Sequence, residues 1–303
     1  MKWRKQGLIY APQGDLWWAK SYATIPTVDV LDDRILRIYF ASLDENRFGR
    51  IGYVDLDAEN PSRILYESPE PILDLGEPGA FDDSGVNPSC VIKVGDEKYL
   101  YYIGWQRCER VPYMLFAGLA TSIGDDRFVR RLQVPVLDRT DAEPFTRSAT
   151  SIIFENGIFK NWYVSAFDWI VVDSVKYPTY VIKYATSADG IVWQSRDETC
   201  INFKDDDEFG FGRPWVVRDA DKYSMWYSIR SKSAPYKIGY AESSDGINWI
   251  RKDDEAGIKR SDTGWDSEMI CYPCVADAGG KRYMFYNGNR HGSTGFGFAT
   301  LES

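Results

Sequence analysis

Two acidic residues, Asp83 and Glu268, each stand five residues before a short strand-like run, which begins at Pro88 and Pro273 respectively. Two carboxyl groups on opposite sides of a ligand cavity can flank a glycosidic oxygen, with one group protonated as general acid and the other ionised. A neighbouring negative charge or an apolar wall would raise the pKa of the acid. We therefore predict paired-carboxylate chemistry on a small sugar or glycoconjugate, with Asp83 and Glu268 as the catalytic residues.

Further polar and aromatic residues lie close to the same runs or to the ends of the strands that follow them. Carboxylates and amides exchange hydrogen bonds with sugar hydroxyls, and aromatic faces cover C–H surfaces. Arginine and histidine side chains there are expected to orient the ligand or to bind an anion. The predicted substrate-binding residues are Asp82, Asn87, Trp105, Glu143, Arg147, Asp168, Glu208, Arg213, Tyr272, Asn289 and His291.

Composition excludes several other function classes. His291 is the sole histidine, so a metal site built from two or more histidines is excluded, and we expect neither a metal nor a cofactor. The net charge of −9 argues against nucleic acid as a partner, because phosphate binding needs a basic face. No apolar run is long enough to span a membrane, and the N-terminus does not resemble a signal peptide. We expect a cytoplasmic protein with a small carbohydrate ligand; its oligomeric state stays open.

The five cysteines are expected to be unbridged. Their number is odd and low for the length of the chain, which disfavours a secreted disulfide framework. Cys271 and Cys274 form a Cys-x-x-Cys motif, but residues three apart on a strand point to opposite faces. We therefore do not expect them to form a redox or metal site.

Three landmarks recur five times along the chain, at intervals of about 60 residues. The first is a strand-like run that starts at Pro26, Pro88, Thr150, Pro214 and Pro273. The second is an aromatic pair: Tyr39-Phe40, Tyr101-Tyr102, Trp162-Tyr163, Trp226-Tyr227 and Phe285-Tyr286. The third is a further run around residues 51–53, 117–119, 182–184, 238–240 and 296–298.

This repeat predicts an all-β fold, a five-bladed β-propeller with four-stranded antiparallel blades, in a single domain over residues 1–303. Each unit contains about four short β runs separated by turn residues, with no long helical period. Radial repetition of four-stranded sheets describes a propeller. The fourth strands are expected at residues 63–66, 128–134, 191–194 and 247–250. The fifth unit has no fourth run of its own, so we predict that residues 7–10 complete it and close the ring.

The first strand of each blade is expected to line the axis of the ring. Because strand side chains alternate, residues one, three and five positions before each run should share one face. Asp83 and Glu268 are among the residues at position five. The residues at position one are Ile25, Asn87, Ala149, Arg213 and Tyr272.

The sequence resembles the superfamily of five-bladed propeller glycosidases that includes glycoside hydrolase families 43, 32, 68, 62 and 130, and within it an uncharacterised glycosidase-like group. The residues that carry the resemblance are 81–90, 212–214, 265–273 and 286–289. The resemblance implies a glycosidase-like enzyme with its site in the central funnel. Families 43, 32 and 68 have an essential Asp at the start of the first inner strand, where residues 20–26 contain no acid. The acid pair is therefore expected at Asp83 and Glu268.

Two alternatives stay open. Similarity to family 130 implies a glycoside phosphorylase, or an enzyme acting on a phosphorylated or nucleotide-linked sugar, with Lys20, Arg147, Arg213 and His291 holding phosphate. The other alternative is a non-catalytic carbohydrate-binding propeller. Phosphate-dependent turnover would identify the first, and sugar binding without turnover the second.

Overall fold

Antiparallel pairing groups the strands into five sheets of four, which we call blades one to five. The computed structural model describes residues 1–124 and 127–302, and within them the only helical segments are η1 (Asp253–Glu255) and α1 (Asn289–Gly292). Blade one consists of β2 (Ser21–Val30), β3 (Ile35–Leu43), β4 (Gly49–Asp57) and β5 (Ile64–Glu67), and blade two of β6 (Gly85–Val94), β7 (Glu97–Arg107), β8 (Tyr113–Ile123) and β9 (Arg127–Arg130). Blade three consists of β10 (Arg147–Glu155), β11 (Ile158–Val172), β12 (Val175–Ser187) and β13 (Gln194–Ile201), and blade four of β14 (Glu208–Arg218), β15 (Tyr223–Ser231), β16 (Lys237–Ser243) and β17 (Ile250–Arg251). Blade five consists of β18 (Cys271–Ala278), β19 (Lys281–Asn287), β20 (Phe296–Leu301) and the N-terminal strand β1 (Trp3–Tyr10). The predicted all-β propeller fold is confirmed.

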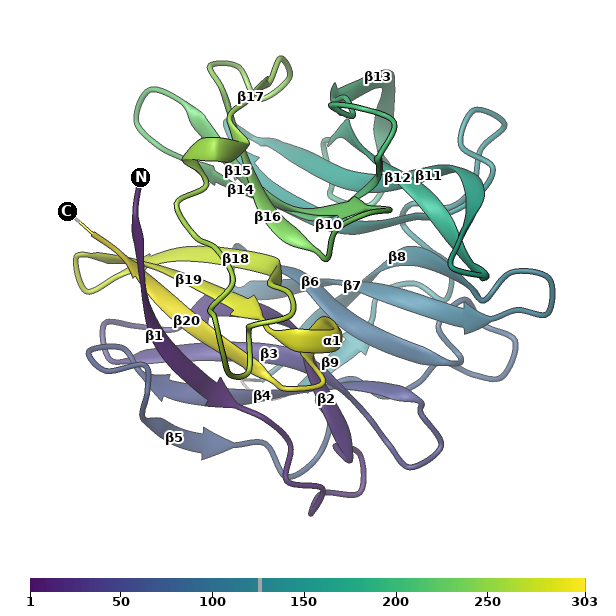
Figure 1. Cartoon of the computed structure of the whole chain (residues 1–303). Coiled ribbons are helices and arrows are strands. Elements are labelled where there is room, and N and C mark those ends of the chain that lie inside the picture. Colours follow the sequence, from purple (N-terminus) through teal and green to yellow (C-terminus); the bar gives the residue numbers. More distant parts are fainter. Residues whose placement is uncertain (125–126, 303) are drawn as a thin grey trace.

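The blades form a closed ring. Contacts between the first strands run from β2 to β6, β10, β14 and β18, and β18 contacts β2 again. In Figure 1 the colours follow this order from purple to yellow, and the purple strand β1 lies beside the yellow strand β20. These two strands pair in antiparallel fashion, with Gly7 opposite Phe298 and Tyr10 opposite Phe296. The predicted closure by the N-terminal strand is confirmed.

The aromatic pair in each second strand explains how the blades pack face to face. Successive side chains of a strand point to opposite faces of the sheet. Tyr101 therefore packs between blades two and three, in the same cluster as Tyr163. Its neighbour Tyr102 packs between blades one and two, in the same cluster as Tyr39. Each sheet thus buries both of its faces.

Two of the fourth strands begin later than the sequence predicts. Strands were expected at residues 191–194 and 247–250, but most of these residues belong to Asp-Gly turns. In the first turn, Asp189 Oδ1 accepts hydrogen bonds from the backbone N–H groups two and three residues later, at 2.8 and 2.9 Å. Asp245 does the same in the second turn, at 2.8 Å. The carboxylate holds the chain in the turn conformation, so the strand starts only beyond it.

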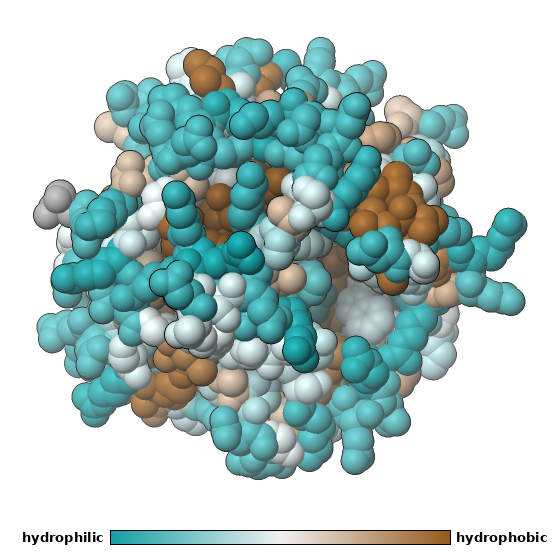
Figure 2. Space-filling model, in the orientation of Figure 1, coloured by the Kyte–Doolittle hydropathy of each residue, from teal (hydrophilic) through white to brown (hydrophobic). Residues whose placement is uncertain are grey.

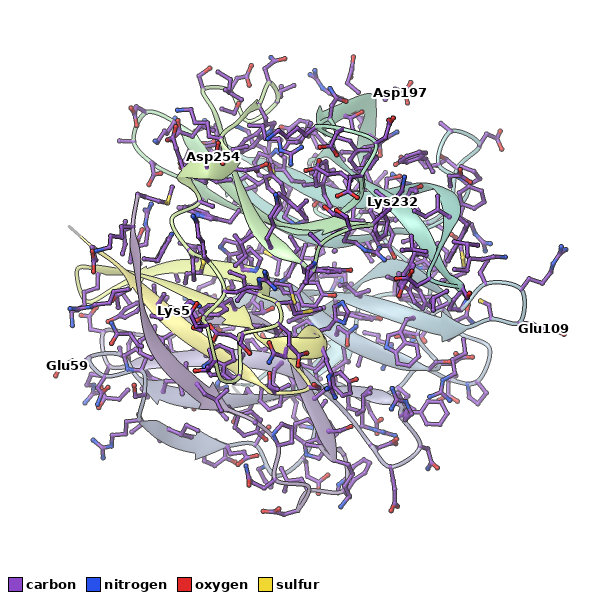
Figure 3. All side chains as sticks on the ribbon, viewed as in Figure 1. Lys5, Glu59, Glu109, Asp197, Lys232 and Asp254 are labelled. Carbon is purple, nitrogen blue, oxygen red and sulfur yellow. The ribbon has the colours of Figure 1, made fainter. Side chains whose placement is uncertain are left out.

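Figure 2 shows a largely hydrophilic face on which the hydrophobic patches are separate. In Figure 3 the labelled Glu59, Glu109 and Asp197 all lie at the periphery of the view. Within the part of the chain that the structure describes, no helix has the length and apolar character needed to span a membrane.

The cysteines differ sharply in accessibility, and this gives a first prediction. All five are unpaired; Cys108 is exposed and the other four are buried. Burial raises the pKa of Cys90 and Cys200 to about 12 and that of Cys274 to about 11, and it also raises the pKa of Cys271. Because the thiolate is the reactive form, brief alkylation of the folded protein at pH 8 should label Cys108 alone. Peptide mass spectrometry checks this, and labelling of Cys271 or Cys274 without denaturant would contradict it.

Candidate functional site

Four of the five first strands contain a bulge at the same place. At each of these positions a non-glycine residue has a left-handed backbone, and the register with the second strand shifts there. Blade two differs, because its shift lies between Pro88 and Cys90. Such backbone conformations cost about 1–3 kcal/mol each and cluster at functional sites, where bulges redirect side chains. The four residues and their φ angles are Ile25 (57°), Ala149 (50°), Arg213 (42°) and Tyr272 (55°).

The bulges open onto a cavity that receives residues from every blade. Its volume is about 390 Å³, within the range of about 300–1,000 Å³ that is typical of small-molecule sites. All five residues that immediately precede the repeated runs line it, as the alternation argument predicts for this position. They are Ile25, Asn87, Ala149, Arg213 and Tyr272.

Aromatic side chains supply much of the remaining lining. Trp105 of β7 packs against Gly85, where a Cβ atom would lie only 2.1 Å from the indole Nε1. A Cβ atom at Gly49 would lie 3.2 Å from the same nitrogen. The two glycines therefore leave the room that the indole occupies beside the cavity. The other aromatic residues of the lining, apart from Tyr272 and His291, are Tyr22, Tyr113, Tyr180 and Tyr236.

The guanidinium of Arg213 donates hydrogen bonds to the first strands of three other blades. This side chain is 1% exposed. Its Nη1 donates to the carbonyl oxygens of Tyr272 and Pro273 at 3.1 and 2.7 Å. Its Nη2 donates to Thr27 Oγ1 at 2.7 Å and to the carbonyl oxygen of Ser89 at 3.5 Å. These acceptors are neutral and belong to blades five, one and two, and burial lowers the pKa of Arg213.

Arg230 and His291 supply further polar groups on the side of blades four and five. Both line the cavity, and Arg230 is 3% exposed. The His291 ring meets the Tyr236 ring edge to face at 4.8 Å. Burial, and after it the positive charge of Arg230, lower the pKa of His291 to about 4. The imidazole is therefore neutral at pH 7 and offers one hydrogen-bond donor and one acceptor.

The structure brings together five of the thirteen predicted site residues. Asn87, Trp105, Arg213, Tyr272 and His291 line the cavity. The other eight lie outside its lining, and their functional roles stay predictions. They are Asp82, Asp83, Glu143, Arg147, Asp168, Glu208, Glu268 and Asn289.

Buried acids outside the lining make contacts that connect the strands of their own blades. Asp82 Oδ2 accepts a hydrogen bond from the Tyr102 hydroxyl at 2.9 Å and pairs with Arg130 Nε at 2.8 Å. Glu143 accepts from the Tyr163 hydroxyl at 3.0 Å and pairs with Arg147 Nε at 3.1 Å. In each case the tyrosine lies twenty residues after the acid.

Two more buried acids are engaged in similar ways. Asp266 accepts from the Tyr286 hydroxyl at 3.0 Å, again twenty residues later, and pairs with Lys5. Both carboxylate oxygens of Glu208 accept from Arg251, at 2.5 and 2.7 Å. Although burial opposes ionisation of Glu208, the Arg251 charge and hydrogen bonds lower its pKa. Each of these buried acids thus has structural partners within its own blade or ring closure, and the predicted ligand-binding roles of Asp82, Glu143 and Glu208 stay predictions.

Asp83 and Glu268 lie in loops and Asp168 lies on an exposed strand position, whereas Asn289 is buried at the start of α1. Asp83 accepts from Gly79 N–H at 2.9 Å and from its neighbouring serine hydroxyl at 2.9 Å. The Glu268 side chain is 57% exposed, with Arg290 Nε 3.7 Å away. Asn289 Oδ1 accepts from the Glu268 backbone N–H at 2.7 Å and so holds this loop. Asp168 is exposed and bonds the backbone N–H of the next residue.

Among the lining residues that were not predicted as site residues are Tyr113, Tyr180 and Tyr236. Each precedes the third landmark of its blade by no more than four residues. The third strand therefore enters the blade beside the cavity. Aromatic residues at this entry point were the signal that could have identified them.

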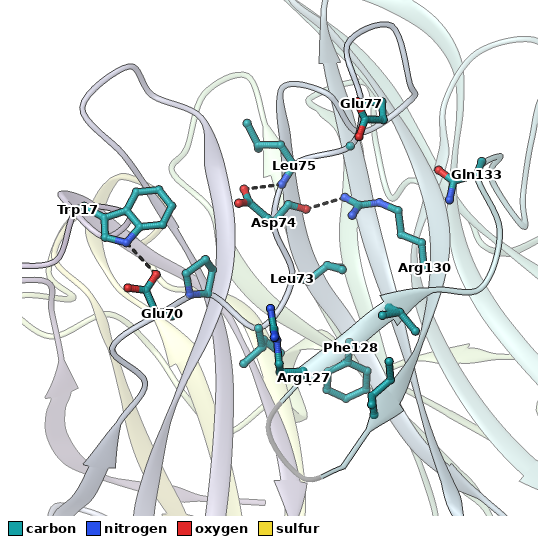
Figure 4. Close-up of a pocket in the computed structure, with 15 residues that line it drawn as sticks. Trp17, Glu70, Leu73, Asp74, Leu75, Glu77, Arg127, Phe128, Arg130 and Gln133 are labelled. Carbon is teal, nitrogen blue, oxygen red and sulfur yellow. Dashed lines mark hydrogen bonds between the residues drawn. The ribbon is translucent and has the colours of Figure 1, made fainter.

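A second hollow, of about 740 Å³, lies between the outer parts of blades one and two (Figure 4). Its polar groups already bond one another: Trp17 Nε1 donates to Glu70 at 2.8 Å, and Arg130 donates to the carbonyl oxygen of Asp74 at 2.6 Å. It is larger than the axial cavity, but it receives side chains from two blades only. We therefore take the axial cavity as the candidate site.

Among the described residues, no group of three or more His, Cys, Asp or Glu side chains is arranged to hold a metal ion. The side chains that line the cavity offer hydrogen bonding, aromatic contact and positive charge.

Comparison with solved structures shows the same architecture in glycoside hydrolases. A glycosyl hydrolase from Bacteroides ovatus aligns over 99% of this chain and 92% of its own, with a TM-score of 0.76 and 13% identity. A structure from the GH130 family of mannoside phosphorylases, which contains hydrolases that target β-1,2 mannosidic linkages, gives a TM-score of 0.76 at 13% identity over 99% and 93% of the two chains. A thermostable family-43 glycoside hydrolase gives a TM-score of 0.62 at 18% identity over 95% and 90%. These likenesses establish the fold.

Sequence comparison identifies much closer relatives. No family model matches the chain. The uncharacterised protein Rv1502 of Mycobacterium tuberculosis strain H37Rv is 39% identical over 303 residues, which is all of both chains. The protein MT1551 of strain CDC 1551 matches equally, at 39% over 303 residues. The chain therefore belongs to the family of Rv1502.

Proposed function

We propose that the protein is carbohydrate-active and glycosidase-like, and that its sugar ligand binds in the axial cavity. The observation that carries this proposal is the aromatic and polar lining to which all five blades contribute. Trp105 and the tyrosines can cover the C–H faces of a sugar, while Asn87 and Arg230 can bond its oxygens. The glycoside hydrolases among the solved structures of the same architecture support this class of function.

Catalysis by Asp83 and Glu268 stays a prediction within this proposal. Paired-carboxylate cleavage needs two carboxyl groups beside the scissile bond, and the described lining of the cavity includes no Asp or Glu. A bound sugar would have to extend beyond this lining to reach either side chain. The same observation favours a second candidate, a propeller that binds carbohydrate without turnover. A phosphorylase remains the third, supported by the two arginines of the cavity.

The cysteines and the net charge of the chain bear on its cellular location and its partners. We infer a cytoplasmic protein, because five unpaired cysteines are typical of a reducing compartment. We infer a small carbohydrate as its ligand, with no nucleic-acid partner, because the chain carries a net charge of −9.

The test of the proposal is calorimetric titration with a panel of mono- and disaccharides. Trp105→Ala should weaken binding of any sugar that binds by about tenfold or more, because aromatic contact and burial are lost. Trp17→Ala is the matched control, since Trp17 is 47% exposed and lies outside the cavity. If no sugar binds, or if both variants behave alike, the proposal is wrong.

Turnover of the same sugars as chromogenic glycosides, with and without phosphate, separates the three candidates. If Asp83 and Glu268 are catalytic, alanine at either should reduce the rate by about 10²–10⁴-fold while the fold is retained. Phosphate-dependent turnover would identify the phosphorylase. Binding by the wild-type protein without turnover would identify the non-catalytic propeller.

A further inference from the structure

The axial cavity contains positive charge without a neighbouring carboxylate. Arg213 and Arg230 are the charged residues of its described lining at neutral pH. The chain as a whole is acidic, with a net charge of −9, yet its buried acids pair with other cations, as Glu208 does with Arg251. An unpaired buried charge is unfavourable. A bound anion would offset that cost.

Arg230 has hydrogen-bond donors to spare. A guanidinium carries five N–H donors. Within the described residues, Nη1 donates to the carbonyl oxygen of Pro178 at 3.2 Å, and the buried Nε has no partner. Aromatic rings surround the Arg230 guanidinium and replace part of its hydration, but they do not accept hydrogen bonds from the N–H groups at its edge. Their centroids lie 4.7 Å (Phe209), 5.1 Å (Tyr177), 5.2 Å (Tyr180) and 5.7 Å (Tyr236) from the guanidinium carbon.

Arg213 differs from Arg230 in this respect. Both of its terminal nitrogens already donate to acceptors on other strands. The buried Nε of Arg213 lacks a partner among the described residues, as that of Arg230 does. Arg230 differs because only its Nη1 donates within the described residues, so its Nη2 is the additional free donor. The two side chains make separable contributions, so they can be tested by separate substitutions.

We infer that the sugar bound in this cavity carries an anionic group, a carboxylate or a phosphate, and that Arg230 binds it. This inference rests on the proposed function. The planar guanidinium matches either anion with two parallel hydrogen bonds. Trp105 of blade two lines the same cavity, so one ligand can contact the indole through its ring and Arg230 of blade four through its anion. Neutral His291 can add one hydrogen bond.

The experiment is calorimetric titration of the whole chain with sugars matched in pairs. Glucuronic acid with glucose and galacturonic acid with galactose form the carboxylate arm. Glucose 1-phosphate and glucose 6-phosphate with glucose form the phosphate arm, and inorganic phosphate is titrated alone. We expect at least one acidic sugar to bind at least about tenfold more tightly than its neutral counterpart, as a charge-assisted hydrogen bond implies. The arm that shows the preference identifies the anion.

Substitutions then assign the preference to one side chain. Arg230→Met should abolish the preference for the acidic sugar. Arg230→Lys keeps the charge but loses the planar pair of N–H donors, so it should keep part of the preference. Arg110→Met is the matched control, because this arginine is exposed and outside the lining. Thermal unfolding of each variant checks the fold. If Arg230→Met does not fold, a preference in Arg230→Lys equal to that of the wild-type protein would overturn the inference.

The other outcomes separate the inference from the proposed function. Equal wild-type binding of acidic and neutral sugars would overturn the inference and leave the proposed function standing. An undiminished preference in Arg230→Met would overturn the assignment to Arg230. Binding of inorganic phosphate without any sugar would support the anion site and contradict the carbohydrate function. Failure of every probe to bind would contradict both.

Discussion

A chain that lacks residues 1–12 should fail to form the native ring. Strand β1 carries two buried aromatic side chains at the closure, Trp3 at 5% exposure and Tyr10 at 7%. Trp3 packs edge-on against Trp226 of blade four at 6.1 Å. Tyr10 packs against Phe40 of blade one at 4.7 Å. The strand therefore joins blade five to both of its neighbours.

The magnitudes explain why this loss should be decisive. Truncation of one buried aromatic side chain costs about 3–5 kcal/mol, and whole domains are stable by only about 5–15 kcal/mol. Deletion removes both rings and the entire ladder with β20. It also breaks the ion pair between Lys5 and Asp266, at 2.6 Å, in which the acid is buried. The remaining blade would expose an unpaired edge.

Circular dichroism and urea unfolding of the truncated chain check this prediction. Point variants provide a graded control within the same strand. Trp3→Ala should lower the free energy of unfolding by about 3–5 kcal/mol, whereas Leu8→Ala, at a side chain that is 44% exposed, should change it by less than about 0.5 kcal/mol. A synthetic peptide of residues 1–12 should restore structure to the truncated chain. Cooperative unfolding at an unchanged urea midpoint without the peptide would show that the ring does not need this strand.

The repeat predicted the ring because the recurring residues are those that pack each blade against its neighbours. This packing is the same in every blade and involves residues close together in the sequence. Each aromatic pair buries one ring on each face of a sheet, as Tyr101 and Tyr102 do. Residues immediately before the runs could also be placed correctly, and all five line the cavity. Alternation then failed for positions three and five. The left-handed residue at the bulge, Arg213 in blade four for example, interrupts the period of two. Asp83 and Glu268 lie outside the lining for a different reason. They precede β6 and β18, which begin at Gly85 and Cys271, so strand alternation does not extend to them.

The contacts between the buried acids and tyrosines of the second strands were not predicted. The spacing of twenty residues from Asp82 to Tyr102, which recurs from Glu143 to Tyr163, was visible in the sequence. A buried tyrosine hydroxyl needs a partner, and an acid at the start of the same blade provides it. The position of Arg230 among four aromatic rings, in contrast, depends on loops and strands of two blades. No local pattern reports such a contact.

Substitution of Arg213 should produce the largest loss of stability expected from a single side chain in the cavity. In Arg213→Met, the aliphatic stem is retained and the guanidinium is removed. The carbonyl oxygens of Tyr272 and Pro273 and the Thr27 hydroxyl then lose a donor at 2.7–3.1 Å, supplied by a side chain that is 1% exposed. Each buried polar group left unsatisfied costs about 1–3 kcal/mol. The relief of an unpaired buried charge offsets part of this sum, so we expect a net loss of about 3–6 kcal/mol.

The neighbouring Arg230 provides the contrast that makes this test specific. Arg230 donates one hydrogen bond within the described residues, to Pro178, so Arg230→Met should cost clearly less stability than Arg213→Met. Arg213→Lys should fall between the wild-type protein and Arg213→Met, because an ammonium group keeps the charge but cannot reach acceptors on three blades with a planar fork. Urea unfolding of the four proteins, with the m-value compared as well as the midpoint, measures these differences. Because the bonds of Arg213 join blades one, two and five to blade four, its loss should also lower the cooperativity of unfolding. If Arg213→Met unfolds at the same midpoint and with the same m-value as the wild-type protein, these bonds do not stabilise the ring, and the charge of Arg213 would instead have to be explained by the ligand.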